Sequence, residues 1–226
     1  MNYPIRSALT FLVGCLFFIA LPGIAWGLGD IQGLLAHQAR LGFFILIFVL
    51  SAFAAIRIPE IGKQRSAPKK TVPHQHLAVV LLQLFSIAIM VIGPYCDRRN
   101  IAAIGGGEAL RYLGLGMYLL GFLTMHYAEA YLGRLFSVEV SIQEGHTLVT
   151  DGPYRHLRHP RYLGITVFSF GLALIFRSWL SMALAMLTTL VLLWRIRDEE
   201  ALMHDEFGSE WEVYARKSWR LIPFIY

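Results

Sequence analysis

Four long runs of apolar residues dominate the first 135 positions of this 226-residue chain. They cover about residues 7–28, 38–58, 77–96 and 109–132. A run of roughly 18 or more apolar residues is typical of a transmembrane helix, because a helix needs that length to cross the hydrocarbon core. Only 15% of the residues are charged, against about 25% in soluble proteins. We therefore predict an integral, multi-pass membrane protein with four transmembrane helices.

Two shorter apolar runs follow, over residues 163–176 and 179–194. Little more than Arg177 and Ser178 separates them, which predicts a tight helical hairpin. Each arm is short for a bilayer about 30 Å thick at a rise of about 1.5 Å per residue. We therefore expect this hairpin either to be tilted or not to span the membrane fully.

In the stretch after the hairpin, residues 195–218, apolar residues recur at helical spacing and acidic residues occupy the other faces. The apolar residues are Met203, Phe207, Trp211 and Tyr214. This pattern predicts an amphipathic helix lying on the membrane surface. The expected fold is all-α, with one membrane domain over 1–226. It divides into a transmembrane scaffold at 1–132 and a more polar region at 134–226.

Positive charges predict the sidedness of the loops. The first apolar run extends past Pro22, too far for the core of a secretory signal peptide, so we expect a retained helix. With a cytoplasmic N-terminus and four crossings, fifteen of the 20 Lys and Arg residues fall on the cytoplasmic side. The other five are Arg40, Arg98, Arg99, Arg111 and Arg177. This distribution follows the positive-inside rule and predicts that both termini and the polar segments after residue 134 are cytoplasmic.

The partners expected from the charge are membrane lipids. A formal net charge of +5 is explained by a basic face against anionic lipid headgroups, so no nucleic acid partner is expected. Two histidine pairs, His74 with His76 and His156 with His159, lack carboxylate or cysteine partners at ligand spacing. We therefore expect no metal ion.

The polar residues of the C-terminal part gather in two blocks. The first block contains Gly152-Pro-Tyr154-Arg-His-Leu-Arg158-His159-Pro160-Arg-Tyr162-Leu-Gly164, and the second begins Arg195-Ile-Arg-Asp-Glu199-Glu200 and continues to Phe207-Gly208. Together with the apolar hairpin between them, these blocks resemble the signature of the isoprenylcysteine carboxyl methyltransferase family. Related membrane methyltransferases that modify phospholipids share the pattern. The resemblance covers about residues 134–226, which we therefore predict to be the cofactor-binding and catalytic region, with the active site on the cytoplasmic side.

The resemblance implies a methyltransferase that uses S-adenosylmethionine and acts on a lipophilic acceptor reaching the site from the bilayer. It assigns Glu199 to the cofactor and Arg195 to the acceptor's carboxylate, so the expected acceptor is the carboxylate of an isoprenylated cysteine. The further cofactor contacts that it implies are Glu139, His146, Thr147, Leu148, Val149, Tyr154, His159, Pro160 and Tyr162. At Glu139 the chain departs from the family pattern, in which we expect glutamine.

Chemistry gives an independent reason for these residue types. Burying a zwitterionic amino acid and a sulfonium near a membrane requires a hydrogen-bond partner for every polar group. Glu199 offers a carboxylate for the ammonium. Arg195 stands four residues earlier, on the same helical face, where its guanidinium can bind a carboxylate through two hydrogen bonds. A carboxylate acceptor is already deprotonated at neutral pH, so no general base is required.

Three alternatives remain open at the level of sequence. Within the same class, the acceptor can be a lipid amine or a thiol. A membrane reductase of the sterol-reductase type carries a similar C-terminal pattern and uses NADPH, whose extra phosphate Arg155, Arg158 and Arg161 can bind. A non-catalytic lipid-binding or scaffold protein is the third alternative, because each motif residue taken singly has a structural explanation.

Overall fold

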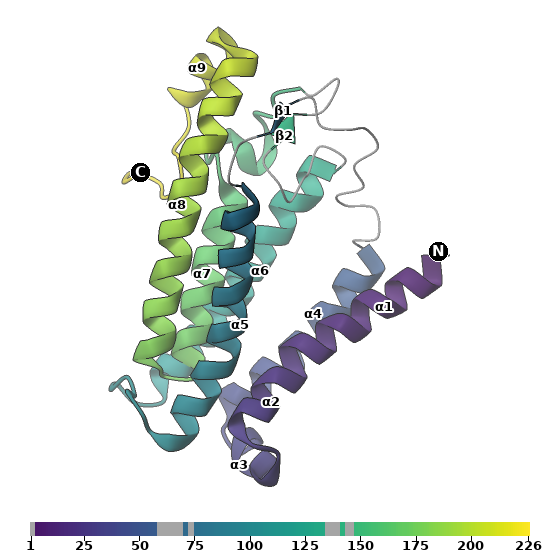
Figure 1. The fold of residues 1–226 in the computed structure, drawn as a ribbon, viewed down its shortest axis with the longest axis vertical. Helices are drawn as coiled ribbons and strands as arrows, with labels where there is room; N and C mark the ends of the chain where they lie inside the picture. The colour runs from purple at the N-terminus through teal and green to yellow at the C-terminus, as the bar shows by residue number, and fades with distance from the viewer. Residues whose placement is uncertain (1–2, 58–69, 72–74, 134–140, 143–146) are drawn as a thin grey trace. The chain divides into compact units, whose positions relative to one another are not determined.

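The computed structural model describes residues 3–57, 70–71, 75–133, 141–142 and 147–226 (Figure 1). Its helices are α1 (Tyr3–Cys15), η1 (Leu16–Ala20), α2 (Leu21–Trp26), η2 (Leu28–Asp30), α3 (Ile31–Leu35), α4 (Gln38–Arg57), α5 (Gln75–Arg99), α6 (Ala109–Leu132), η4 (Gly152–Arg155), α7 (Pro160–Ile175), α8 (Trp179–Phe207) and α9 (Ser209–Ala215). Strands β1 (Lys70–Thr71) and β2 (Ser141–Ile142) form an antiparallel pair with Lys70 opposite Ile142. The predicted helical class is confirmed, and within the described residues this short pair is the one regular sheet.

The number of membrane spans is smaller than predicted when it is counted by length and composition over the described residues. Only α5 and α8 are long and apolar enough, and the bent pair Phe11–Trp26 and Leu28–Leu35 brings the total to three if it counts as one span. The two parts of that pair meet at 83°. In α4 the described side chains give an apolar stretch of shorter length, Gln38–Phe53. Helix α6 is long enough, but its composition is not apolar enough. The predicted count of four is therefore not confirmed.

The bend after α2 has a local cause. Gly27 adopts a φ of 112°, which an L side chain rarely tolerates, and the helix ends there. The next turn is capped by Asp30, whose carboxylate accepts the backbone N–H of Gly33 at 3.1 Å and the indole N–H of Trp26 at 3.1 Å. The helix formed by the first apolar run therefore ends at Trp26, and a separate short helix, η2, begins at Leu28.

The second arm of the C-terminal hairpin is much longer than predicted. Helix α8 continues without a break through Arg195 to Phe207, so the expected start of a separate surface helix at residue 195 is wrong. Only α9, seven residues long, follows as a separate helix. The physical reason is that α8 contains no proline or glycine before Gly208, which has a φ of 52°. At about 1.5 Å per residue, its 29 residues extend about 43 Å, enough to cross a bilayer.

The chain divides into two compact units, each assembled from stretches that are distant in the sequence. The first comprises Met1–Pro59, Leu84–Leu120 and Val167–Leu187, and the second comprises Glu60–Gln83, Gly121–Thr166 and Thr188–Tyr226. Each of the helices α5 to α8 contributes one segment to the first unit and one segment to the second. The single membrane domain with a catalytic region at 134–226 stays a prediction.

Aromatic rings and a close backbone approach form the core of the first unit. The ring of Phe43 on α4 is fully buried, and its centroid lies 5.1 Å from that of Tyr118 on α6 and 5.5 Å from that of Phe176. A Cβ at Gly114 would lie 2.6 Å from the carbonyl oxygen of Gly171. The absence of a side chain there lets α6 and α7 pack backbone to backbone.

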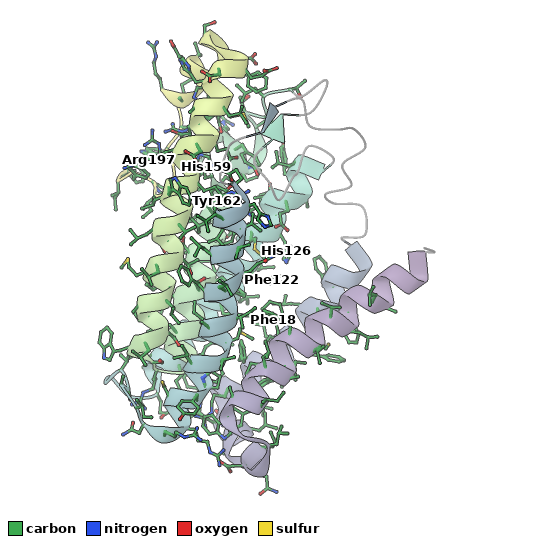
Figure 2. All side chains as sticks on the ribbon, in the orientation of Figure 1. Phe18, Phe122, His126, His159, Tyr162 and Arg197 are labelled. Carbon is green, nitrogen blue, oxygen red and sulfur yellow. The ribbon has the colours of Figure 1, made fainter. Side chains whose placement is uncertain are left out.

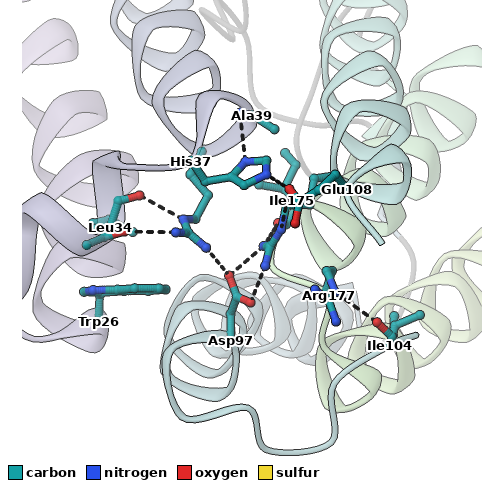
Figure 3. Close-up of polar contacts among 12 residues, drawn as sticks. Trp26, Leu34, His37, Ala39, Asp97, Ile104, Glu108, Ile175 and Arg177 are labelled. Atoms are coloured by element: carbon teal, nitrogen blue, oxygen red, sulfur yellow. Dashed lines mark hydrogen bonds and ion pairs between the residues drawn. The ribbon is translucent and has the colours of Figure 1, made fainter. Parts of the chain in front are cut away.

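A cluster of buried charges ties together the helix ends of the first unit (Figure 3). The carboxylate of Asp97 accepts Nη1 of Arg40 at 3.0 Å and both Nη1 and Nη2 of Arg111, at 2.7 and 2.8 Å. Arg40 also donates to the carbonyl of Leu34 at 2.8 Å, and Arg111 donates to that of Ile175 at 2.7 Å. Because each buried guanidinium has a carboxylate partner, its desolvation is offset and the cluster joins α3 to α7 in this unit.

The second unit has its core between α7 and α8. The buried members of this core are Tyr162, Leu192, Ile196 and Leu221, with Leu82 of α5 packed against them. A Cβ at Gly164 would lie 2.6 Å from the backbone nitrogen of Met125 and 2.7 Å from the carbonyl oxygen of Gly121. Helices α6 and α7 therefore touch through their backbones in this unit as well.

The C-terminal tail pairs with the segment that leads into α7. Leu157 and Trp219 form a parallel bridge. The backbone N–H of Arg158 donates to Trp219 O at 2.8 Å, and that of His159 donates to Arg220 O at 3.2 Å. This pairing holds the first residues of the Arg-His-Pro-x-Tyr block in one conformation at the start of α7.

Candidate active site

All nine of the predicted site residues that the structure describes lie in the second unit. They are Thr147, Leu148, Val149, Tyr154, His159, Pro160, Tyr162, Arg195 and Glu199. Glu139 and His146 lie outside the described residues. Thr147, Leu148 and Val149 form a non-helical stretch, and the structure records no bond from them to the other predicted residues within the described part of the chain. The remaining six lie in the segment that leads into α7, in the first turn of α7, and on α8 at residues 195 and 199.

Tyr162 stands at the centre of this group, in the first turn of α7. Its hydroxyl donates to Oε2 of Glu199 at 2.6 Å. Its ring stacks on that of His159, with centroids 5.5 Å apart and planes 4° from parallel. Figure 2 labels these two side chains next to each other. The guanidinium carbon of Arg195 lies 5.7 Å from the ring centroid, within the range of a cation–π contact. Tyr162 therefore contacts both Glu199, the residue predicted to bind the cofactor, and Arg195, the residue predicted to bind the acceptor.

The two adjacent glutamates of α8 have different surroundings. The carboxylate of Glu200 lies 2.7 Å from Nε of Arg158, 2.7 Å from Nε of Arg220 and 3.3 Å from Nε2 of His159. Its side chain is 11% exposed. The side chain of Glu199 is 23% exposed, with Tyr162 as its hydrogen-bond donor and His159 Nδ1 at 4.0 Å. Glu200 is thus occupied by protein cations, and Glu199 is the more accessible carboxylate.

Tyr154 forms a second buried phenol beside this group. Its hydroxyl donates to the carbonyl of Ala128 at 3.3 Å, and its own carbonyl accepts the hydroxyl of Tyr214 at 2.7 Å. The preceding turn needs a left-handed residue, which Gly152 supplies with a φ of 54°. Burial raises the pKa of Tyr154, and the negative charge of Glu199 raises it further. Tyr154 is therefore a buried, neutral tyrosine that borders the site.

The sequence analysis missed a polar triad that joins α6 to α7. Glu129 is buried, and its Oε1 accepts Nε of Arg161 at 2.8 Å while its Oε2 lies 2.8 Å from Nδ1 of His126. Arg161 is thus not simply a loop charge on the basic side of the membrane. The available signal was Glu129 itself, because an acidic residue inside an apolar helix usually has a partner and a role.

Arg158 also proves to be a structural residue. Besides its bond to Glu200, its Nη1 donates to the carbonyls of Ala215 at 2.7 Å and Ser218 at 2.5 Å. These bonds fasten the tail after α9 to the entrance of α7. Of the three arginines considered for a nucleotide phosphate, Arg158 and Arg161 are therefore engaged with carboxylates, and Arg155 is exposed.

No group of three or more His, Cys, Asp or Glu side chains placed to hold a metal occurs in the part of the chain that the structure describes. The polar side chains of the site carry carboxylate, phenol, imidazole and guanidinium groups. This set offers hydrogen bonds of both polarities to an organic ligand.

The fold and the site together define a helical integral membrane protein with a polar site in its C-terminal part. Residues 114–205 match the isoprenylcysteine carboxyl methyltransferase (ICMT) family model. This stretch contains both the Arg-His-Pro-x-Tyr block and Arg195 to Glu200, so the predicted resemblance is confirmed.

Several named proteins are similar to this part of the chain. A probable protein-S-isoprenylcysteine O-methyltransferase of Oryza sativa subsp. japonica is 35% identical over 121 residues, which is 50% of this chain and 61% of the rice protein. The protein-S-isoprenylcysteine O-methyltransferase of Schizosaccharomyces pombe is 35% identical over 125 residues, 52% of this chain and 49% of that protein. The matched region therefore spans less than two thirds of each of these relatives.

A solved structure extends the similarity to the whole fold. The eukaryotic intramembrane Ras methyltransferase ICMT aligns with 99% of this chain and 75% of its own, with a TM-score of 0.56 and 22% sequence identity. At this identity the comparison establishes a shared fold. The apolar helices outside residues 114–205 thus have counterparts in a membrane protein.

Proposed function

We propose that this protein is a membrane-embedded methyltransferase that uses S-adenosylmethionine to methylate a lipophilic acceptor. The observation that carries the proposal is the convergence of Arg195 and Glu199 on Tyr162, inside the stretch that matches the family. The best acceptor is the carboxylate of an isoprenylated cysteine. A phospholipid amine or a thiol is the second choice, since either would need a proton acceptor in addition.

The residues present fit the cofactor by the chemistry of their donors. Glu199 offers an accessible carboxylate for an ammonium group, and Tyr154 and His159 offer buried polar atoms beside aromatic surface. S-adenosylmethionine, when bound, supplies an activated methyl group. The further contacts proposed for the cofactor are Glu139, His146, Thr147, Leu148, Val149, Pro160 and Tyr162.

Arg195 is the proposed acceptor residue. It is 3% exposed and stands on α8 one helical turn before Glu199. A guanidinium donates two parallel hydrogen bonds to a carboxylate and would hold it in a fixed orientation beside the cofactor site. Because this acceptor carries no proton at neutral pH, the contribution of the protein is alignment and exclusion of water rather than proton transfer.

Calorimetric titration in detergent tests the cofactor. We expect S-adenosylhomocysteine to bind, and NADPH to show no comparable affinity. Two ion pairs, Arg158 with Glu200 and Arg161 with Glu129, support this preference for S-adenosylhomocysteine over NADPH. Both arginines already engage carboxylates, so neither is available to the extra phosphate of NADPH. A preference for NADPH would assign the protein to the reductase alternative, and no binding of either ligand would favour a non-catalytic role.

We also propose that the chain crosses the membrane four times before the hairpin, with both termini and the site on the cytoplasmic side. Single cysteines at Lys63, Gly105 and Lys217 test this in a chain whose Cys15 and Cys96 are replaced by alanine. We expect an impermeant thiol reagent to label positions 63 and 217 from the cytoplasmic face and position 105 from the opposite face. Labelling of positions 63 and 217 from different faces would contradict both the helix count and the orientation.

A further inference from the structure

One side chain joins the two halves of the proposed site. The hydroxyl of Tyr162 bonds Glu199 at 2.6 Å, its ring lies parallel to His159, and the guanidinium of Arg195 lies over the same ring. Tyr162 is itself 6% exposed and packs in the core of the second unit with Leu192 and other residues of α8. A buried, packed tyrosine has few rotamers available, so its hydroxyl is held in one place.

The orientation of Glu199 depends on that hydroxyl. A glutamate on an exposed helix face rotates about three side-chain bonds, and its partial exposure gives it room to do so. A carboxylate has two oxygens and can accept about four hydrogen bonds. The Tyr162 hydroxyl donates to Oε2, and within the part of the chain that the structure describes no bond to Oε1 is recorded. The bond to Oε2 restricts the directions in which Oε1 can point.

We propose that Tyr162 is a positioning residue, whose hydroxyl orients the Glu199 carboxylate for the ammonium group of the cofactor. The inference rests on the proposed function. It assigns Tyr162 a role exerted through Glu199, in addition to any direct contact with the cofactor. Glu200 cannot replace Glu199 in this role, because Arg158, His159 and Arg220 already engage its oxygens.

A double-mutant cycle on cofactor affinity tests this role. The four proteins are wild type, Tyr162→Phe, Glu199→Ala and the double variant, each titrated calorimetrically with S-adenosylhomocysteine in detergent. Phenylalanine keeps the ring, its stacking on His159 and its packing, and removes only the hydroxyl. Because that hydroxyl bonds a charged group, we expect Tyr162→Phe to weaken binding roughly 10-fold or more when Glu199 is present. In the Glu199→Ala background the same change should alter affinity less than about two-fold.

A matched control and a stability measurement separate positioning from packing. Tyr112→Phe also removes a hydroxyl bonded to a side chain, Gln38 at 3.1 Å, but in the first unit, and should leave affinity unchanged. Thermal unfolding of every variant verifies folding. Equal weakening by Tyr162→Phe in both backgrounds, or no weakening at all, would overturn the positioning role while leaving the proposed function intact. Failure of the wild type to bind S-adenosylhomocysteine would overturn the proposed function, and the inference with it.

Discussion

Replacing Arg195 by alanine should abolish methyl transfer to a farnesylated cysteine analogue and leave the affinity for S-adenosylhomocysteine within a few-fold of wild type. Its guanidinium is the proposed partner of the acceptor, and the carboxylate that serves the cofactor belongs to Glu199. Lysine at position 195 should restore little activity, because an ammonium cannot reproduce a planar fork of two donors. A radiolabelled methyl assay combined with calorimetric titration measures both quantities.

The companion variant at Glu199 should show the opposite behaviour. Removing one partner of a desolvated charge pair commonly costs about 2–5 kcal/mol, roughly 30-fold or more in affinity. Glu199→Gln should therefore weaken cofactor binding directly. Arg197→Ala, on an exposed position of the same helix, serves as the control and should change neither quantity. Normal turnover in Arg195→Ala would remove the carboxylate acceptor and favour a neutral one, and equal loss of cofactor binding in both variants would make the pair structural.

Replacing Glu200 by alanine should lower the free energy of unfolding by about 3–5 kcal/mol, because it leaves Arg158, whose side chain is 10% exposed, without its carboxylate. Arg158 and Arg220 both lie 2.7 Å from this carboxylate, and its side chain is 11% exposed. Chemical unfolding of the detergent-solubilised protein measures the change. Glu212→Ala removes an exposed ion pair to Arg216 at 3.4 Å and should cost at most about 1 kcal/mol.

The loss at Glu200 should also loosen the C-terminal tail. Arg158 follows Leu157 and Arg220 follows Trp219, so the carboxylate of Glu200 contacts both segments that the Leu157–Trp219 bridge pairs. Hydrogen exchange of the tail amides should therefore become faster in Glu200→Ala than in Glu212→Ala. Unchanged stability and exchange would mean that the tail is held without Glu200, by its backbone bonds, by the bonds from Arg158 to Ala215 and Ser218, and by Leu221 in the core.

Local patterns in the sequence were sufficient for the class of the protein and for the central pair of the candidate site. Hydropathy is summed over neighbouring residues, so the apolar runs identified a helical membrane protein without knowledge of any long-range contact. Arg195 and Glu199 could be placed together because four residues make about one helical turn. The Arg-His-Pro-x-Tyr block pointed to Tyr162 and His159, which the structure brings to the same group.

Tertiary structure decided the features that depend on charged partners far apart in the chain. The contrast between Glu199 and Glu200 is the clearest of these features. Arg158 and Arg220, both distant in sequence from Glu200, lie 2.7 Å from its carboxylate. The cost of burying a charge is set by the groups that surround it in three dimensions, and a linear pattern does not contain them.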